Sequence, residues 1–399
     1  MALELKHNKK YRFPWTSGNQ FSLLVDGPAF FSAMIKDIQQ AKHYILFEMY
    51  LVIPGQVSQN FFNALCEAAQ RQIKIYVLFD DFGARTISDY QRQQLINCGI
   101  HLHFYNPLKL SKKSLMLFRD HRKLMVVDGY TAYVGGAGLM DEFDSPQPEN
   151  NWHETMVRIQ GCNVLQWQSL FYDNWQKWST EQIELITPEF PDWSQTGRVT
   201  MTQGPRFMEI KRSFIKHVRN AQQRVWISTA YFAPSRKLRR ELCRTARRGI
   251  DIRILIPGPI TDNPMSRYLA QYYYTKLLLA GVRIYEYQPR FMHAKIVLCD
   301  DWVSTGSCNI DRWNLRWNLD ANQEIDDKKF SAEVTDMFMT DFSNSTEILF
   351  NEWQKRSIIS KIRTGFWVHA IRIADSLLTR LKIIRYWKQL NHRKGKQQS

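Results

Sequence analysis

The chain has 399 residues, of which 44% are hydrophobic and 13% aromatic, so intrinsic disorder is excluded and the length suits two domains rather than one. Its net charge of +16 predicts a polyanionic partner, and charge alone does not separate nucleic acid from an anionic membrane. The six cysteines do not show the short paired spacing that is typical of a zinc site. We expect all six to be reduced residues of the protein core, in a reducing compartment: Cys66, Cys98, Cys162, Cys243, Cys299 and Cys308.

The N-terminal stretch from Met1 to Trp15 carries four basic residues but no long apolar run behind them. A signal peptide or a membrane-spanning helix requires such a run. We therefore expect neither export nor integral insertion into a membrane.

Apolar segments and helical patterns alternate through the first half of the chain. The expected elements are a helix starting at Gly27-Pro28, a strand over Tyr44 to Ile53, a helix through Phe62, Leu65 and Ala69, a buried strand over Ile73 to Asp80, a helix ending at Cys98-Gly99 and a strand over Ile100 to Tyr105. This alternation predicts a βαβ architecture with a largely parallel sheet. Within the second element we expect Glu48 to be a satisfied buried carboxylate, with a supporting role near a site as the alternative.

The second half repeats the first in the same order. Three segments correspond: Ala221 to Ile227 matches Ala41 to Leu46, Arg248 to Ile256 matches Arg71 to Phe79, and Ala280 to Tyr285 matches Cys98 to His103. Fixed order at similar offsets indicates a duplication. We place the first half at residues 1–187, a linker rich in helix and strand breakers at 188–205, and the second half at 206–350.

One short pattern occurs once in each half, directly after the third pair of matching segments. His121-Arg122-Lys123 precedes an apolar run that ends at Asp128, and His293-Ala294-Lys295 precedes one that ends at Asp300. Each apolar run predicts a buried strand, so the histidine and the lysine project from the same face at its entrance. One copy alone is more often structural than catalytic, but two copies in duplicated halves predict a single active site built from both.

Histidine is suited to act as nucleophile or proton donor near neutral pH, and a lysine ammonium offsets the charge of a phosphate. No cluster of metal-ligating residues lies near either motif in the sequence. The pattern therefore predicts phosphoryl transfer without a metal, through a covalent phosphohistidine.

Both motifs match the HxKxxxxD signature, and the chain resembles the phospholipase D superfamily, in particular the bacterial cardiolipin synthases of the shorter form without N-terminal transmembrane helices. Gly135-Gly136 after the first motif and Gly306-Ser307-Cys308-Asn309 after the second are similar to the glycine-containing phosphate loops of that family. The resemblance covers roughly residues 15 to 350. It implies an α/β fold of two duplicated α/β/α halves, each with a mostly parallel mixed sheet, and an active site at their interface.

The resemblance also implies roles for individual residues. His121 is the expected nucleophile and His293 the expected general acid, although each half presents the same groups and the two roles can be exchanged. The expected phosphate ligands are Lys123, Lys295, Asn309 and Ser307. A carboxylate downstream of each motif, Glu154 and Asp320, is expected to hold a histidine ring. Asp128 and Asp300 complete the signature, and we expect them to tie the halves together.

The first loop departs from the family pattern. Gly138 stands where the family usually has an asparagine, so one side-chain contact to phosphate is missing. A backbone N–H or a water can replace it, or the first half binds a different headgroup. The departure bears on substrate preference rather than on the chemistry.

The resemblance implies a phosphatidyl transferase that forms cardiolipin from phosphatidylglycerol, with phosphatidylethanolamine as a second candidate donor and with no cofactor. The alternatives are a phospholipase D-type hydrolase, a phosphatidylserine synthase, a phosphodiester nuclease and a non-enzymatic module that docks on anionic membrane. We do not expect nucleic acid as partner, and the oligomeric state stays open.

Residues 351–399 differ in composition from the rest of the chain. Twelve basic residues stand against two acidic ones, so we expect the excess charge to belong to this tail. Helical apolar spacing and two tryptophans, Trp367 and Trp387, predict an interfacial helix drawn to anionic lipid. A helix packed on the body with a solvated basic face is the alternative. We expect a peripheral protein on the cytoplasmic face of the bacterial inner membrane.

Overall fold

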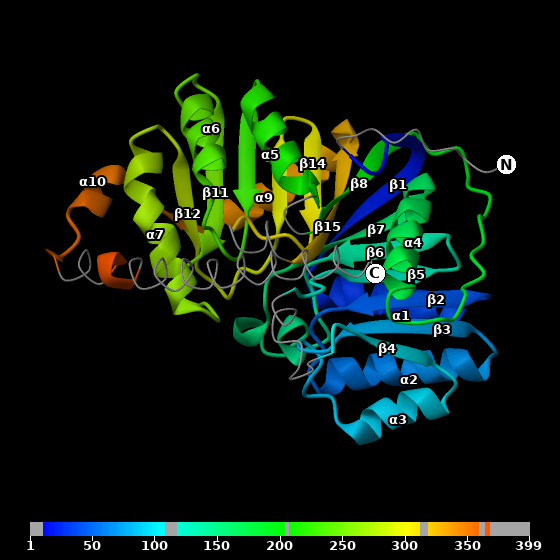
Figure 1. The fold of residues 1–399 in the computed structure, drawn as a ribbon. Coiled ribbons are helices and arrows are strands. Elements are labelled where there is room, and N and C mark those ends of the chain that lie inside the picture. The colour runs from blue at the N-terminus through cyan, green and yellow to red at the C-terminus, as the bar shows by residue number, and fades with distance from the viewer. Residues whose placement is uncertain (1–10, 108–117, 204–206, 312–317, 359–363, 368–399) are drawn as a thin grey trace, which may run out of the picture.

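The computed structural model describes residues 11–107, 118–203, 207–311, 318–358 and 364–367. These residues form two halves of similar architecture that lie side by side around one long sheet (Figure 1). The predicted duplication is therefore visible in the fold.

The elements of the first half follow the predicted order, and their bounds are β1 (Thr16–Val25), α1 (Gly27–Gln40), β2 (Tyr44–Met49), α2 (Gln56–Gln70), β3 (Lys74–Asp80), α3 (Asp89–Asn97), β4 (His101–Tyr105), β5 (Lys123–Val127), β6 (Thr131–Gly135), the 3-10 turns η2 (Asp141–Phe143) and η3 (Pro148–Asn150), β7 (Thr155–Gly161) and α4 (Cys162–Trp175). Pro28 occupies the first turn of α1, where its missing N–H costs nothing. Gly99 adopts a φ of 89° just past α3, which is a conformation that ends a helix.

The second half repeats this series, and its bounds are β8 (Gln195–Gln203), β9 (Phe207–Met208), α5 (Glu209–Asn220), β10 (Arg224–Ser228), α6 (Arg236–Ala246), β11 (Asp251–Pro257), α7 (Pro264–Leu278), β12 (Arg283–Tyr287), β13 (Ile296–Cys299), β14 (Trp302–Gly306), β15 (Leu319–Asp326), α9 (Lys328–Ser343), β16 (Ser345–Glu347) and α10 (Phe350–Gln354). Each strand from β10 to β15 has its counterpart among β2 to β7, and corresponding strands have corresponding neighbours in the sheet, except that β12 also pairs with β16 whereas β4 is an edge strand.

The sheet is mixed, and most of its pairings are antiparallel. In the first half only β2–β3 and β3–β4 are parallel, and in the second half only β10–β11 and β11–β12. The motif strands β5 and β13 run antiparallel to both of their neighbours. The α/β class is confirmed, whereas the expectation of a mostly parallel sheet is wrong, because the chain returns by hairpins after each motif.

The two half-sheets are joined at the centre of the molecule. Strand β8 pairs with β15 of its own half and with β1 of the first half, both antiparallel. Residues 195–203 of the predicted linker are therefore a central strand, and of its described residues only 188–194 lie outside a helix or strand. The breakers that suggested a linker include Gly197, which lies inside β8 where Asn163, Phe21 and Gln323 leave no room for a Cβ atom.

Helices cover both faces of the sheet and create three apolar cores. One core lies between the sheet and the helices α4 and α9 and extends through both halves. The other two lie on the opposite face, under α1 to α3 in the first half and under α5 to α7 in the second. This α/β/α layering was expected, and it leaves the strand ends at the junction of the halves free to build a site.

One cysteine prediction is wrong. Cys66 of α2 and Cys98 at the end of α3 form a disulfide, with Cα atoms 5.4 Å apart. The other four cysteines are free, and three of them are buried as expected. The sequence separation of 32 residues gave no sign of the pairing, because packing of α2 against α3 is what brings the two thiols together.

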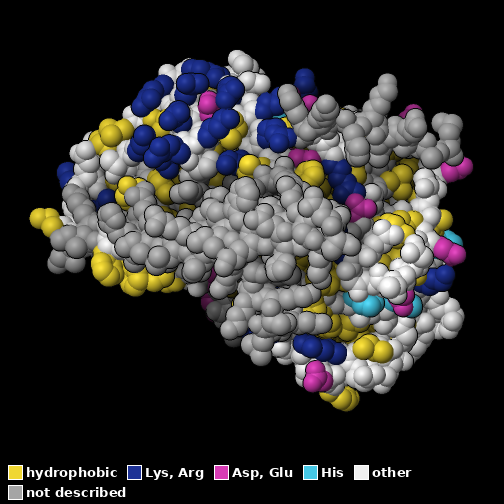
Figure 2. All heavy atoms as spheres, viewed as in Figure 1, with side chains coloured by type: hydrophobic (Ala, Val, Ile, Leu, Met, Phe, Trp, Pro, Cys, Tyr) yellow, Lys and Arg dark blue, Asp and Glu magenta, His cyan; other side chains and the backbone are white. Residues whose placement is uncertain are grey.

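Charge is distributed differently from the expectation. Basic side chains gather over α5 and α6 on the body of the second half (Figure 2). The excess charge is therefore not confined to the tail. The predicted amphipathic tail of residues 351–399 lies outside the described residues except for 351–358 and 364–367. Among the helices that the structure does describe, none is long and apolar enough to span a membrane.

Candidate active site

The two motifs meet where the half-sheets join. His121 lies two residues before β5, and His293 three residues before β13. Their side chains are mostly buried, with 13% and 12% of their surface exposed. The structure thus brings the two predicted histidines into one enclosed region built by both halves.

Each histidine is held by a carboxylate from the other half. Nδ1 of His121 lies 2.9 Å from Oδ1 of Asp320, and Nδ1 of His293 lies 2.5 Å from Oε2 of Glu154. Sequence order pairs each carboxylate with the motif of its own half, and the structure corrects this pairing. Because both carboxylates contact Nδ1, the Nε2 atom of each ring is the one left for chemistry.

Backbone hydrogen bonds also join each histidine to the opposite half. The N–H of His121 donates to the carbonyl of Leu319, the residue before Asp320, over 2.9 Å. The N–H of His293 donates to the carbonyl of His153, the residue before Glu154, over 2.7 Å. Ring and backbone of each histidine are therefore both set by the opposite half.

The two motif lysines are buried beside the histidines. Nζ of Lys295 donates to the carbonyl of His293 over 2.5 Å and to Oε2 of Glu154 over 3.1 Å. Nζ of Lys123 donates to the carbonyl of His121 over 2.7 Å and lies 4.9 Å from the centre of the Tyr50 ring. Two ammonium groups therefore converge where a phosphate would need compensation.

Burial controls the protonation of these groups. Burial and then Lys295 lower the pKa of His293 to about 4, and burial and then Lys123 lower the pKa of His121. Burial and the charge of Lys295 lower the pKa of Lys123 to about 7. Burial alone would raise the pKa of Glu154, but Lys295 and His293 outweigh it and hold that pKa below its usual range. Without substrate the centre thus holds neutral imidazoles and an ionised Glu154.

The two carboxylates are accommodated differently. Ser307 donates its hydroxyl to Oδ1 of Asp320 over 2.7 Å. At the matching position of the first half stands Gly136, where a Cβ atom would come within 2.1 Å of Oε2 of Glu154. The longer glutamate fills the space that the serine fills in the other half. Ser307 therefore orients Asp320, and its expected contact with phosphate stays a prediction.

Asn309 is the clearest candidate for a phosphate ligand besides the lysines. Its side chain is buried, and neither its Oδ1 nor its Nδ2 atom has a hydrogen-bond partner in the described chain. Such an amide costs free energy unless a ligand satisfies it. Gly138, its counterpart, lies against Leu51, whose carbonyl oxygen would be 2.8 Å from a Cβ atom. The loop packing explains why no asparagine stands there.

The motif aspartates lie at the far ends of their strands and act within their own halves. Asp128 accepts hydrogen bonds from the backbone N–H groups of residues 42–44, and Asp300 accepts them from residues 222–224. Both adopt a φ of 53°, which aspartate tolerates better than most residues. Their role is structural, but they do not tie the two halves together as expected.

A family model described as "Cardiolipin synthase, PLD-like domain" matches residues 34–168 and 214–342, one stretch in each half. The chain belongs to this phospholipase D-like family. Membership confirms the resemblance and the fold class, and it supports the predicted enzyme class, a phosphatidyltransferase.

Curated relatives of this phospholipase D-like protein bear matching names. It is 31% identical to the major cardiolipin synthase of Bacillus subtilis (strain 168), over 88% of this chain and 74% of that protein. It is 32% identical to cardiolipin synthase A of Pseudomonas putida (strain W619), with the same coverage. Cardiolipin synthase A of Pseudomonas aeruginosa (strain LESB58) is 31% identical over 87% of this chain and 71% of its own length.

Two solved structures share the fold. Phosphatidylserine synthase of Haemophilus influenzae superposes with a TM-score of 0.69 at 15% identity, over 90% of this chain and 94% of that one. Polyphosphate kinase of Porphyromonas gingivalis superposes with a TM-score of 0.53 at 13% identity, over 79% of this chain and 49% of that one. At such identities the likeness concerns the fold alone.

The surroundings of the two histidines in this phospholipase D-like centre differ. Aromatic rings of Phe143, Trp152 and Phe291 lie 5.3 to 5.6 Å from the ring of His293. The centre of the His121 ring lies 4.8 Å from the centre of the Tyr50 ring. The denser aromatic wall around His293 agrees with its strongly lowered pKa, because aromatic neighbours do not solvate an imidazolium as water does.

His153 is a functional candidate that the sequence analysis missed. Its Nδ1 lies 2.8 Å from Asp26 of the first half and its Nε2 lies 3.2 Å from Asp341 of α9 in the second half. These two carboxylates raise its pKa to about 9 against the effect of burial. The matching residue of the second half is Leu319, so this charged clamp exists on one side only. In the sequence, the position of His153 directly before the predicted ring-holding carboxylate Glu154 was the feature that could have identified it as a candidate.

We expect His153→Gln to lower the free energy of unfolding by roughly 2 to 3 kcal/mol at pH 7. A histidine whose pKa is raised on folding stabilises fully below its unfolded pKa of about 6.5 and loses that effect as the pH rises through about 9. Urea unfolding of both proteins at pH 7 and pH 10 measures this. A stability difference that is equal at the two pH values would contradict the imidazolium clamp.

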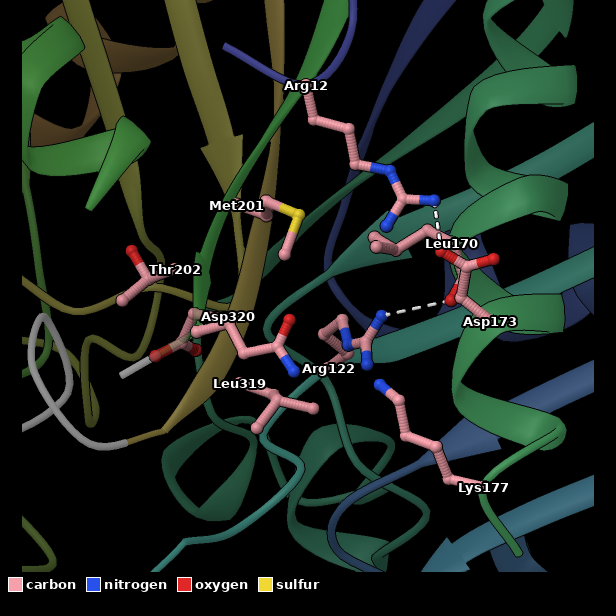
Figure 3. Close-up of a pocket in the computed structure, with 10 residues that line it drawn as sticks. Arg12, Arg122, Leu170, Asp173, Lys177, Met201, Thr202, Leu319 and Asp320 are labelled. Carbon is pink, nitrogen blue, oxygen red and sulfur yellow. Dashed lines mark hydrogen bonds and ion pairs between the residues drawn. The ribbon is translucent and has the colours of Figure 1, made fainter. Parts of the chain in front are cut away.

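A second polar cluster lies behind His121. Arg122 pairs with Glu48 and with Asp120, each over 3.2 Å, and all three side chains are buried. Oε1 of Glu48 is therefore paired, whereas its Oε2 atom has no hydrogen-bond partner among the described residues, so the expectation of a satisfied carboxylate holds only in part. Arg122, Arg12 and Lys177 line a small cleft that also has Asp320 in its wall (Figure 3). Neither motif histidine lines this cleft, so it supports the site from behind and does not hold the reacting groups.

Proposed function

We propose that the protein is a cardiolipin synthase that transfers a phosphatidyl group from one phosphatidylglycerol to another through a covalent phosphohistidine. One observation carries the proposal: two histidine–lysine pairs, one from each half, share an enclosed centre in which each ring is held by the carboxylate of the opposite half. Such a centre offers one Nε2 atom from each half to one phosphodiester.

In the first step, Nε2 of His121 attacks phosphorus and forms the P–N bond, while the bond from phosphorus to the glycerol oxygen breaks. The negative charge of the bound phosphodiester favours the protonated form of His293, which takes up a proton at Nε2 when the substrate binds. His293 gives that proton to the leaving oxygen, and glycerol leaves. Lys123, Lys295 and the amide of Asn309 would compensate the phosphoryl oxygens. Glu154, which is ionised, stabilises the imidazolium of His293 before it releases the proton.

In the second step the proton transfer by His293 runs in the opposite direction. His293 takes the proton of a hydroxyl group on the second phosphatidylglycerol, whose oxygen attacks phosphorus as the P–N bond breaks. The products are cardiolipin and the free enzyme. Donor and product are both phosphodiesters, so the exchange needs no nucleotide to drive it. Phosphatidylethanolamine, which carries the same phosphodiester, is a second candidate donor.

We place the reaction at the membrane, with the protein bound peripherally to the cytoplasmic face of the bacterial inner membrane. Both substrates are bilayer lipids, and the described helices include none that spans a bilayer. The bond to be broken lies at the headgroup level, which a protein bound to the surface can reach.

A lipid-product assay tests the function. Detergent-solubilised protein given phosphatidylglycerol alone should yield cardiolipin and glycerol in equal amounts by mass spectrometry. Phosphatidic acid as the only product would indicate a hydrolase, and phosphatidylserine on addition of serine would indicate the synthase alternative. Cleavage of single- or double-stranded DNA without lipid product would indicate the nuclease.

We expect Lys123→Arg to remove the alkaline fall of kcat/KM. The pKa of Lys123 in the free enzyme is about 7, so its charge and its attraction for a phosphodiester are lost above that pH, whereas arginine stays charged. Activity measured from pH 6 to pH 9 should fall about tenfold or more in the wild type and stay nearly level in the variant. If kcat/KM of the variant falls between pH 6 and pH 9 while that of the wild type stays level, a group other than Lys123 causes the loss of activity at alkaline pH.

A further inference from the structure

Cations are concentrated in one stretch of the second half. Residues 209–253 contain thirteen Lys and Arg residues and three acidic ones. Six of these cations are exposed on α5 and α6: Arg212, Lys216, Arg219, Arg236, Lys237 and Arg240, with Arg244, Arg247 and Arg248 continuing the surface at the end of α6. The surface that these residues define is here called the α5–α6 face, and Figure 2 shows basic side chains gathered over the two helices.

The fold does not require these charges, as the first half shows. The matching residues 29–76 contain four basic and three acidic residues. Helix α6 has five Lys and Arg residues, and its counterpart α2 has none. Two helices with the same place in the same architecture therefore differ by five positive charges, so the difference serves something other than folding.

The charges of α6 also oppose its own stability. Ser235 caps the helix by accepting the N–H of Leu238, and the first turn that follows contains Arg236 and Lys237 but no acidic residue. Cations at a helix N-terminus face the positive end of the helix dipole, which is unfavourable. Glu241, the one acidic residue of α6, pairs with Arg219 and Arg244. Within the described chain, no ion pair compensates Arg236, Lys237 or Arg240.

We propose that the α5–α6 face docks the protein on an anionic phospholipid bilayer, an inference that rests on the proposed function. Lys and Arg residues near such a surface are attracted to its anionic headgroups. Helix α6 starts in the connection after β10, at the strand end that faces the site. Ile260, which is 45% exposed, lies in the next connection along that edge, between β11 and α7, and Met265, which is 40% exposed, lies in the first turn of α7. Apolar side chains beside cations suit a lipid interface better than a nucleic acid.

The test compares two triple variants that remove the same charge. One is Arg236→Gln/Lys237→Gln/Arg240→Gln on the α5–α6 face, and the control is Lys36→Gln/Lys42→Gln/Lys74→Gln, three exposed lysines of the first half. Both are made in full-length protein carrying His121→Ala, so that turnover does not alter the lipids. Sedimentation with phosphatidylcholine vesicles, with and without phosphatidylglycerol, gives the affinity.

We expect the α5–α6 variant to bind phosphatidylglycerol vesicles at least about tenfold more weakly than the control, with a reduced dependence on salt. Its melting temperature should be unchanged or higher, because cations leave the helix N-terminus. Equal vesicle binding by the two variants overturns the inference, as does a loss confined to duplex DNA binding. Cardiolipin formation is measured separately in detergent with His121 intact, so failure of the proposed function is recognised independently of failure of docking.

Discussion

Replacing His121 by alanine is expected to lower kcat for cardiolipin formation by at least about 10⁴-fold, because no P–N bond can form. His293→Ala should lower it comparably with phosphatidylglycerol, whose glycerol leaving group needs a proton. The two variants separate with a phosphodiester of p-nitrophenol, a leaving group that departs without protonation. His293→Ala should then release about one equivalent of p-nitrophenol and retain the phosphoryl group on His121.

Mass spectrometry of the digested protein locates that group. A phosphoryl group on His293 in the His121→Ala variant, with none on His121 in the other, would exchange the two roles. The strongly lowered pKa of His293 makes this comparison necessary, because a neutral imidazole is also what a nucleophile requires. A folded, lipid-binding His121→Ala protein with wild-type turnover would contradict the phosphohistidine mechanism altogether.

The second large effect on kcat is expected from the two carboxylates that each contact the histidine of the opposite half, Asp320 and Glu154. Asp320→Asn should reduce kcat by about 10³- to 10⁴-fold with little change in KM, since an amide in place of a carboxylate holds the imidazole in the wrong tautomer. The affected histidine should be His121, in the first half, although Asp320 lies in the second. Glu154→Gln should in turn impair His293.

The p-nitrophenyl substrate distinguishes these two variants as well. Asp320→Asn should slow the release of p-nitrophenol because its partner His121 is the attacking group, whereas Glu154→Gln should leave that release largely intact. The reverse result would mean that each carboxylate serves the motif of its own half or that the histidine roles are exchanged. The phosphoryl site found in the His293→Ala protein decides between these two readings.

Much of this architecture follows from local sequence. The two HxKxxxxD runs predict buried strands that begin beside a histidine, and β5 and β13 are those strands. The repeated order of apolar segments predicts the duplicated halves. Periodicity and motif spacing depend on residues that are close together in the sequence, so they predict features that such residues determine.

The remaining features arise from contacts between distant segments. Glu154 and Asp320 were identified as ring-holding carboxylates, but their crossing depends on how β7 and β15 meet the opposite motif. Cys66 and Cys98 pair only because α2 packs beside α3. Strand β8 looked like a linker because Gly197 broke the pattern, and only its pairing with β1 and β15 makes it a strand. No residue in these cases carries the information alone.

The crossing of the histidine pairs has a consequence during biosynthesis. His121 leaves the ribosome long before its carboxylate, which follows 199 residues later. A nascent or truncated chain that ends before residue 320 carries an intact first motif and no Asp320 to orient it. The proposed activity therefore requires both halves of the chain, because each histidine depends on a carboxylate that the other half supplies.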